Sequence, residues 1–185
     1  MAMNLSHWIE RHADFSPDKL AIRCGERELT YGQMAGDISR LAQALKLKFK
    51  IGRGDRIALL AQNTAQSLVV AFACARIGAI YHPLNWRQAA PEHTYALNNS
   101  TPKVLFVAGD FAELVESIAG AIPEMAFVNL QEGGKAGWPS YPSLIDEAPG
   151  GIESDPEVSL DDSFLLCYTS GTTGRPKGAV LSQNA

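Results

Sequence analysis

The first part of the chain carries hydrophobic side chains at the spacing of amphipathic helices. In two segments, mostly apolar residues recur every three or four positions, which places them on one face of a helix. The residues that share these faces are Leu5, Trp8, Ile9 and His12 in the first segment, and Met34, Ile38, Leu41 and Leu45 in the second. We expect ERELTY (26–31) between the two helices as a strand or a turn, and the glycines of KIGRGD (50–55) to end the second helix.

Residues 56–130 alternate between short apolar runs and helical segments. The runs of strand length are RIALLA (56–61), AIYHPL (79–84), KVLFVA (103–108) and AFVNL (126–130). The helices expected between them run from about Thr64 to Ile77, within PEHTYALNN (91–99) and within DFAELVESIAG (110–120), with caps at Asn63, Gly78 and Asp110. This order predicts an α/β fold in which βαβ units form a mainly parallel sheet with flanking helices. Ligands of such sheets bind at the carboxyl ends of the strands.

The composition changes after Leu130. Residues 131–161 contain five glycines and four prolines, together with many acidic residues, and show little periodicity. Such a segment predicts a long connection between two packed units. We therefore expect an N-terminal α/β portion at 1–130, a connection at 131–162, and at 163–185 the first strand of a second subdomain with the loop that follows it. The strand FLLCY (164–168) is expected in a sheet separate from the first.

Composition and charge are those of a globular protein without a nucleic-acid-binding surface. The 185 residues are 46% hydrophobic and 19% charged, with a net charge of −4, and the 16 Lys and Arg residues are scattered along the chain. Nucleic acids and anionic membranes are therefore not expected as partners. The chain has no apolar stretch of membrane-spanning length, and its start, MAMNLSHWIERHADF, lacks the pattern of a secretory signal. We expect no transmembrane segment and a cytoplasmic location.

The positions of cysteine and histidine argue against disulfides and metal sites. The three cysteines form no CxxC pair, and an odd number is atypical of a secreted disulfide framework. Cys74 and Cys167 lie in apolar runs, so we expect them in the core. The four histidines have no metal-ligand spacing with one another or with a cysteine, and a metal site built from side chains is therefore not expected.

The strongest chemical signal is the segment YTSGTTGRPKG (168–178), which leaves the end of the strand FLLCY. Its glycines allow positive φ angles and let backbone N–H groups approach an anion. Its hydroxyl side chains can donate hydrogen bonds to phosphate oxygens, Pro176 stiffens the segment, and Lys177 adds a positive charge. The segment contains no general base and no nucleophile with a partner, so we expect it to position polyphosphate without making bonds itself. A surface turn rich in Gly, Ser and Thr is the simpler alternative, which the complete pattern disfavours.

Two other phosphate-binding patterns fit the chain poorly. A P-loop, GxxxxGK[ST], needs a glycine before its lysine and a hydroxyl after it. Counted from Gly171, those two positions hold Pro176 and Gly178. A GxGxxG pattern follows none of the expected strands.

The segment YTSGTTGRPKG closely resembles the phosphate-loop signature of the adenylate-forming enzymes, which include acyl-CoA synthetases, firefly luciferases and the adenylation domains of peptide synthetases. LTYGQM (29–34) is similar to the "TY-x-x-L" segment near the start of these enzymes, with methionine in place of leucine. Residues 55–92 resemble a second block, in which a strand, a buried helix ending in "GA" and a "PLN-x-R" turn follow one another. Within the superfamily, PLNWR (83–87) is more similar to fatty-acid and aryl-acid CoA ligases than to peptide-synthetase domains.

This resemblance implies a two-step reaction. A carboxylate attacks the α-phosphate of Mg·ATP to give an acyl-adenylate and pyrophosphate, and a thiol, usually coenzyme A, then displaces AMP. ATP, Mg²⁺ and coenzyme A are the implied cofactors, and a small-molecule carboxylic acid is the implied substrate. By position, the residues that would hold the β- and γ-phosphates are Thr169, Ser170, Gly171, Thr172, Thr173, Gly174 and Lys177.

The rest of the family's machinery has no counterpart within residues 1–185. In the family, the carboxylate pocket, the adenine-binding segment, the acidic Mg²⁺ ligand and the C-terminal domain with its adenylation lysine all follow the phosphate loop. Catalytic residues are therefore expected beyond Ala185, and we expect an N-terminal piece of a longer acyl-CoA ligase that is inactive alone. A non-catalytic nucleotide-binding or interaction module and an adenylation domain for a different acid class stay open. A carrier protein as thiol acceptor and a homodimer also stay open.

Two single residues bear on this resemblance. Gln183 stands where many members of the family have the histidine of an LSH segment, which makes a catalytic role at that position doubtful. Arg87 of the PLNWR turn is more often a solvated or structural arginine than a functional one.

Overall fold

Helices and strands alternate along the chain in nearly the order that the sequence predicts. The computed structural model describes residues 3–150, 152–169 and 176–185. The helices are α1 (Ser6–Phe15), α2 (Tyr31–Phe49), α3 (Ala65–Ile77), α4 (Ala90–Ser100), α5 (Ala112–Ile118) and α6 (Tyr141–Asp146), with short 3-10 helices η1 (Gly109–Phe111) and η2 (Ala119–Ala121). The strands are β1 (Leu20–Cys24), β2 (Arg27–Thr30), β3 (Arg56–Leu60), β4 (Ile80–Pro83), β5 (Val104–Val107), β6 (Ala126–Asn129), β7 (Ser163–Thr169) and β8 (Lys177–Ser182). Within the described ranges, no helix combines the length and the apolar character needed to cross a membrane.

Six strands form one sheet, in the order β6-β5-β3-β4-β7-β8, while β1 and β2 form a separate antiparallel hairpin. Neighbouring strands of the large sheet run parallel, except that β7 and β8 are antiparallel. The predicted α/β fold with a mainly parallel sheet is therefore confirmed.

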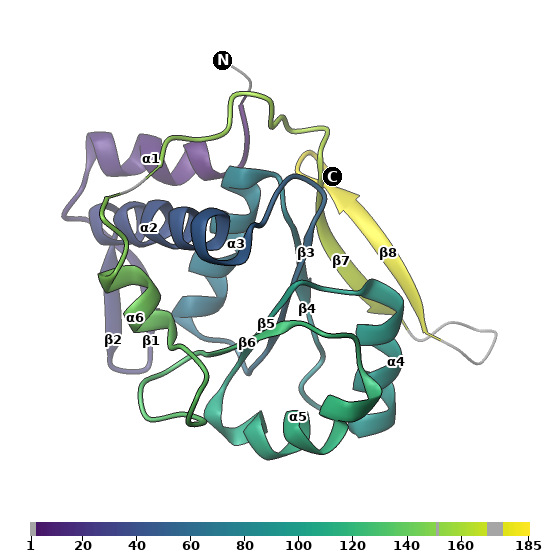
Figure 1. Ribbon diagram of the computed structural model, residues 1–185. Helices are drawn as coiled ribbons and strands as arrows, with labels where there is room; N and C mark the ends of the chain where they lie inside the picture. Colours follow the sequence, from purple (N-terminus) through teal and green to yellow (C-terminus); the bar gives the residue numbers. More distant parts are fainter. Residues whose placement is uncertain (1–2, 151, 170–175) are drawn as a thin grey trace.

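The large sheet separates two hydrophobic clusters. On β3, Ile57 and Leu59 pack into one cluster and Ala58 and Leu60 into the other, as the alternation of side chains along a strand requires. The first cluster also contains buried residues of α2, α3 and α6, and the second contains those of α4 and α5. Figure 1 shows these two groups of helices on opposite sides of the sheet. The result is a three-layer arrangement that buries both faces of the sheet.

The ends of α2 and α3 are set by local hydrogen bonds. Thr30 caps α2, because its hydroxyl accepts from the backbone N–H of Gln33 and its own N–H donates to the Gln33 side chain. The same helix ends at Lys50, which has a left-handed conformation (φ 54°), so the chain leaves the helix before the glycines that were expected to end it. At α3, Thr64 provides the cap and the prediction of Asn63 is wrong, whereas the predicted Gly78 does end the helix (φ 71°).

Two further details of the sequence prediction are wrong. Asp110 caps no helix, because the chain forms η1 there and the residue before α5 makes no side-chain cap. Trp8 was expected on the packed face of α1, but 55% of its surface is exposed, and Ile9 alone of that expected face packs against the core cluster. Helix α1 lies at the margin of the first layer and contacts mainly α2, so a single apolar row is enough to attach it.

The segment between β6 and β7 is more structured than its composition suggests. Helix α6 begins at a Ser140 cap and buries Tyr141, Leu144 and Ile145 in the first cluster. Strand β7 then pairs with β4, so the prediction of a separate sheet for FLLCY is wrong. The open edge of β4 leaves backbone N–H and C=O groups that need partners, and β7 supplies them.

Candidate functional site

The two residues that flank positions 170–175 lie opposite each other at the end of a strand pair. Strands β7 and β8 are in register with Thr169 opposite Lys177 and Tyr168 opposite Gly178. Because β7 runs parallel to β4, this end of β7 lies at the same edge of the sheet as the carboxyl end of β4 (Figure 1). Parallel sheets bind their ligands at this edge.

Two of the seven residues expected to hold phosphate fall within the described ranges. Thr169 and Lys177 both have exposed side chains. None of the ion pairs between described residues includes Lys177, so no described carboxylate competes with an anion for its ammonium group. The other five lie outside the described residues: Ser170, Gly171, Thr172, Thr173 and Gly174.

Tyr168, the residue before Thr169, is held by aromatic packing and a hydrogen bond. The centre of its ring lies 5.2 Å from that of His82 on β4 and 6.4 Å, edge to face, from that of Tyr95 on α4. Its hydroxyl donates to Oδ1 of Asn99 on the same helix at 2.6 Å. Burial raises the pKa of Tyr168, which keeps the hydroxyl protonated as this hydrogen bond requires.

Gly178 fits beneath the ring of Tyr168 because it has no side chain. A Cβ atom at this position would lie 2.9 Å from Cδ1 of Leu166 and 3.3 Å from Cζ of Tyr168. A P-loop needs a serine or threonine at this point of its sequence. The close packing around Gly178 therefore disfavours the serine or threonine that a P-loop has at this position.

His82 joins β4 to β7 from within the core. Only 1% of its surface is exposed, and its Nδ1 lies 3.0 Å from the carbonyl oxygen of Leu166. A carbonyl oxygen only accepts hydrogen bonds, so Nδ1 carries the proton and Nε2 is an acceptor. Burial lowers the pKa of His82 to about 4 against the opposing effect of the Leu166 hydrogen bond, and nearby His93 lowers it further. The imidazole is therefore neutral at neutral pH.

A cavity of about 270 Å³ opens beside these residues, and its lining includes His82, Asn85, Gln88, Cys167 and Tyr168. Within the described ranges, Nε2 of His82 has no hydrogen-bond partner. Burial raises the pKa of the Cys167 thiol, which keeps it protonated and unreactive as a nucleophile. The cavity thus offers hydrogen bonds and apolar contact, but no activated nucleophile and no charged base.

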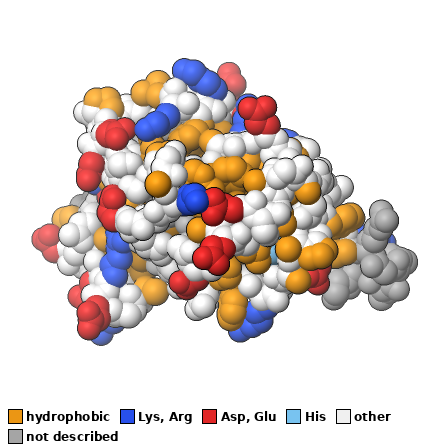
Figure 2. Space-filling model, turned by 60° about the horizontal axis from the view of Figure 1, so that its bottom comes forward, with side chains coloured by type: hydrophobic (Ala, Val, Ile, Leu, Met, Phe, Trp, Pro, Cys, Tyr) orange, Lys and Arg blue, Asp and Glu red, His pale blue; other side chains and the backbone are white. Residues whose placement is uncertain are grey.

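A larger hollow of about 500 Å³ lies at the same edge of the sheet, between the β1 hairpin and the start of α3. Its lining is mostly apolar and includes Ile22, Leu68 and Tyr81. Figure 2 turns this edge forward and shows hydrophobic side chains gathered near the middle of the face. No group of three or more His, Cys, Asp or Glu side chains suited to a metal ion occurs in the described part of the chain, so the hollow offers apolar contact and no metal site.

Gln183 lies at the opposite end of β8 from Lys177, about 20 Å away at ~3.4 Å per residue. Its side chain is buried, accepts a hydrogen bond from the N–H of Leu5 at 2.8 Å and donates one to the carbonyl of Ala75 at 3.2 Å. A neutral imidazole also has one donor and one acceptor nitrogen, so glutamine offers the same two kinds of hydrogen bond as histidine. These two hydrogen bonds connect the end of β8 to the start of the chain and to α3.

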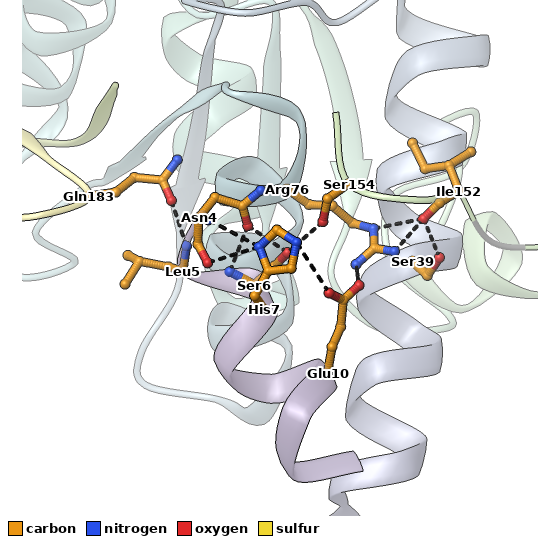
Figure 3. A network of polar contacts seen from close by, with 10 residues as sticks. All are labelled: Asn4, Leu5, Ser6, His7, Glu10, Ser39, Arg76, Ile152, Ser154 and Gln183. Atoms are coloured by element: carbon orange, nitrogen blue, oxygen red, sulfur yellow. Dashed lines mark hydrogen bonds and ion pairs between the residues drawn. The ribbon is translucent and has the colours of Figure 1, made fainter. Parts of the chain in front are cut away.

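The same part of the molecule contains a buried arginine (Figure 3). Arg76 on α3 is 5% exposed, and its guanidinium donates to the carbonyl of Ile152 and pairs with Glu10 on α1. Ser39 on α2 donates to the same carbonyl at 2.8 Å. This network joins α1, α2 and α3 to the segment that leads to β7.

Arg87 and the two cysteines of the apolar runs differ in their surroundings. The exposed guanidinium of Arg87 lies over the ring of the adjacent Trp86, with 4.2 Å between its Cζ and the ring centre. Cys74 is fully buried in the first cluster, as expected, whereas Cys167 is half-buried and lines the cavity beside His82.

Three residues around the candidate site were missed from the sequence. His82 is a polar residue inside an apolar strand, and Tyr95 and Asn99 are four residues apart on one face of α4. The single buried histidine in AIYHPL is a weak signal, because such residues are commonly satisfied in a core. Nothing in the local sequence connects α4 with residues more than 65 positions later in the chain.

Comparison with protein families and characterised proteins gives one consistent result. Residues 9–185 match the family described as AMP-binding enzyme. The chain is 44% identical over 183 residues to an indoleacetate–CoA ligase of Aromatoleum aromaticum, covering 99% of this chain and 36% of that protein. It is 36% identical over 174 residues to a fatty acid–[acyl-carrier-protein] ligase, ScoC, of Streptomyces coeruleorubidus, covering 94% of this chain and 32% of that protein. The chain thus spans about a third of the length of these relatives.

Solved structures give the same match in three dimensions. The anthranilate CoA ligase AuaEII in complex with anthranoyl-AMP superposes with a TM-score of 0.92 at 30% identity, over 98% of this chain and 35% of that one. The N-terminal domain of FACL13 from Mycobacterium tuberculosis superposes with a TM-score of 0.79 at 29% identity, over 97% of this chain and 44% of that one.

Proposed function

Because the chain belongs to the AMP-binding enzyme family, whose matched relatives are adenylate-forming CoA ligases, we propose that it forms the N-terminal part of a longer ATP-dependent acyl-CoA ligase. In this proposal, the complete enzyme joins a carboxylic acid to ATP as an acyl-adenylate and releases pyrophosphate. A thiol, coenzyme A, then displaces AMP. The division of the chain at 130 and 162 remains part of the proposal, with 163–185 leading into a second subdomain of the longer protein even though β7 and β8 extend the first sheet.

The observation that carries the proposal is the position of Thr169 and Lys177. They lie opposite each other at the carboxyl end of a strand that runs parallel to β4, where parallel sheets bind ligands. We propose that Thr169, Lys177 and the five residues between them that complete the expected set (Ser170, Gly171, Thr172, Thr173 and Gly174) hold the β- and γ-phosphates of ATP. An ammonium group and several hydroxyls neutralise and orient phosphate without taking part in bond formation, which suits the departing pyrophosphate portion.

We propose an aromatic or fatty carboxylic acid as substrate. The names of the relatives support this class, because they include an indoleacetate–CoA ligase, a feruloyl-CoA synthase and a fatty acid–[acyl-carrier-protein] ligase. The last of these also supports an acyl carrier protein as the alternative thiol acceptor.

Mg²⁺ fits this proposal as an ion that arrives with ATP. The described part of the chain has no group of His, Cys, Asp or Glu side chains that could form a metal cage. Within residues 1–185, the Thr169 hydroxyl is of the kind that can contact a phosphate-bound Mg²⁺, and Lys177 would share the task of neutralising the phosphates. Carboxylate ligands for the ion would come from other parts of the longer protein.

The short span of the match favours an inactive piece over a complete enzyme. The chain covers 36% of the length of the indoleacetate–CoA ligase. We therefore propose that residues 1–185 alone do not catalyse adenylation. A nucleotide-binding or interaction module is the second candidate, and the same limited span favours it.

Pyrophosphate exchange tests the proposal. Labelled pyrophosphate is incubated with ATP and a panel of aryl, fatty and amino acids, using the longest protein that the gene encodes and the 185-residue chain in parallel. We expect exchange that depends on an aryl or fatty acid with the longer protein, and none with the chain. A preference for an amino acid would reject the proposed substrate class, and exchange by the 185-residue chain would reject its inactivity.

A further inference from the structure

Helix α4 contacts both strand ends that flank the candidate phosphate site. Its Tyr95 hydroxyl donates to the carbonyl oxygen of Pro176 at 3.1 Å, directly before β8. One turn later, Oδ1 of Asn99 accepts from the hydroxyl of Tyr168 at 2.6 Å, next to the end of β7. Residues at i and i+4 lie on one face of a helix, so a single face of α4 reaches both strands.

From these contacts we propose that α4 is a positioning element, which fixes the ends of β7 and β8 and thereby sets the positions of Thr169 and Lys177. This inference rests on the proposed function, because it gives those two residues a polyphosphate to hold. Tyr95 and Asn99 are positioning residues that act through Tyr168 and Pro176.

The contact to Pro176 is specific in its chemistry. Proline has no backbone N–H, so its carbonyl oxygen is the only backbone group that can hold it by a hydrogen bond. Lys177 follows directly, and its position opposite Thr169 depends on where β8 begins. The Tyr95 hydroxyl therefore fixes the chain one residue before the proposed phosphate-binding lysine.

The contact to Tyr168 is reinforced from two sides. The ring is packed between His82 of β4 and Tyr95 of α4, and Gly178 of β8 allows it to lie close to the neighbouring strand. Since Tyr168 pairs with Gly178 across the two strands, its ring links β7, β8 and α4 at one point. Movement of either strand end would break at least one of these contacts.

Helix α4 is itself attached firmly enough to serve as an anchor. At its start, the N–H of Ala89 donates to the Glu92 carboxylate at 2.7 Å, which caps the helix itself, and Ala96 and Leu97 are buried in the second cluster. At its end, Arg56 on β3 donates to the carbonyl of Ser100 at 2.7 Å and to both oxygens of Thr101. A cation at a helix C-terminus also interacts favourably with the helix dipole. The helix is thus fixed to the central strand of the sheet.

Anchoring matters because a phosphate-binding group contributes most when its position is fixed before the ligand arrives. If α4 fixes the positions of Thr169 and Lys177, loss of one of its hydrogen bonds to the strand ends should lower the affinity for ATP. A step that does not involve the β- and γ-phosphates should be unaffected. The displacement of AMP by the thiol is such a step.

Tyr95→Phe and Asn99→Ala test the proposal, with Asn98→Ala as the matched control. Asn98 lies on the same helix, but its amide donates to Thr94 and Ala121, away from both strands. Since β8 is an edge strand, only one of the neighbouring amides of Lys177 and Gly178 donates to β7. In the 185-residue chain, we expect hydrogen exchange of that amide to rise about fivefold in Tyr95→Phe, the equivalent of one hydrogen bond. We expect the amides at the end of β7 to respond in the same way in Asn99→Ala, and neither set to respond in Asn98→Ala.

Kinetics of the longer protein test the effect of these variants on function. We expect KM for ATP in the adenylation step to rise about fivefold in both anchor variants, with an unchanged rate of AMP release from preformed acyl-adenylate and thiol. Equal changes in amide exchange and KM in all three variants, or amide exchange that rises evenly over the whole sheet, would overturn the proposal that α4 positions the ends of β7 and β8. Failure of the unaltered longer protein to use ATP would instead reject the proposed function, while the amide exchange still decides whether α4 holds the strands.

Discussion

The buried His82 should make the stability of the protein depend on pH between about 4 and 6.5. In the folded chain its pKa is lowered to about 4, against an ordinary value of 6.5. Between these two values the unfolded chain binds a proton that the folded chain does not, so acidification stabilises the unfolded state. Stability is therefore complete above about pH 6.5 and falls as the pH decreases toward 4.

The size of the effect follows from the two pKa values. At ~1.4 kcal/mol per pKa unit, the full difference corresponds to about 3 kcal/mol, and about 2 kcal/mol of this is lost by about pH 5. His93 on α4 also has a pKa lowered mainly by burial, so it adds to the loss with the same sign. The pKa values of Asp155 and Asp162 are lowered too, because their hydrogen bonds outweigh the opposing effect of burial. Their contribution disappears only below their ordinary value of 3.8, outside this window.

Urea unfolding at about pH 7.5 and about pH 5 measures this contribution directly. His82→Gln should reduce the difference between the two free energies of unfolding by about 2 kcal/mol, whatever it does to stability at the higher pH. Cys74→Ala is the control, because burial raises the pKa of this thiol and keeps it neutral at both pH values. If His82→Gln and the unaltered chain lose the same free energy of unfolding on acidification, the assignment of a neutral, buried imidazole to His82 is wrong.

Three further pairs of variants test the packing around the site and its support. Gly178→Ser should lower the unfolding free energy by about 1 kcal/mol, because a Cβ would press on Cδ1 of Leu166 and on the ring of Tyr168. Gly109→Ser, where a Cβ meets nothing within 4 Å, should change it little, and equal losses on urea unfolding would contradict this. Gln183→His should keep the free energy of unfolding within about 1 kcal/mol of the original, and Gln183→Leu should lower it by about 2 kcal/mol, because leucine makes neither hydrogen bond of Gln183. The reverse order of stability in thermal unfolding would contradict a contribution from these two hydrogen bonds. Arg76→Met should cost about 3 kcal/mol, because its buried guanidinium pairs with half-buried Glu10 and donates to the carbonyl of Ile152. Arg23→Met, in an exposed pair with Glu28, should cost under about 1 kcal/mol, and similar losses on urea unfolding would contradict the effect of burial.

The elements that the sequence predicts best are those defined by local pattern. Helix α3 is apolar nearly all round and is bounded by Thr64 and Gly78, and residues such as Val69 and Cys74 are fully buried in it. Strands β3 to β6 are short apolar runs separated by helices, which is the pattern of a sheet covered on both faces. Such features depend only on residues that are close in the chain, so a single sequence is enough to predict them.

Features that depend on distant partners were missed or predicted wrongly. Strand β7 joins β4 across more than 75 residues, and the pairing satisfies backbone groups that every strand has, so no side-chain pattern predicts it. Helix α6 lies in a segment rich in glycine and proline, where three buried apolar residues were too few to show a period. Trp8 has helical spacing with its neighbours but lies where the first layer ends, which sequence spacing does not reveal.

The candidate site shows the same division. The segment YTSGTTGRPKG identifies the phosphate-binding region through its own residues. Its supports, Tyr95, Asn99 and His82, come from other elements and become visible only when the fold brings them to Tyr168 and Pro176. Gln183 could be noticed as a departure from the family, but its two buried hydrogen bonds at the far end of β8 required the structure.

The central claim is that Lys177 and its neighbours hold the phosphates of ATP during acid activation. Lys177→Met in the longer protein tests it most directly, with Lys19→Met as the control because Lys19 is equally exposed but belongs to the turn before the β1 hairpin. The measurement is the kcat/KM for ATP in acid-dependent pyrophosphate exchange. We expect Lys177→Met to lower it about 100-fold, as loss of a charged contact to the departing phosphates requires, and Lys19→Met to leave it unchanged. An equal, small effect of both substitutions would contradict the assignment of this strand end as the phosphate site.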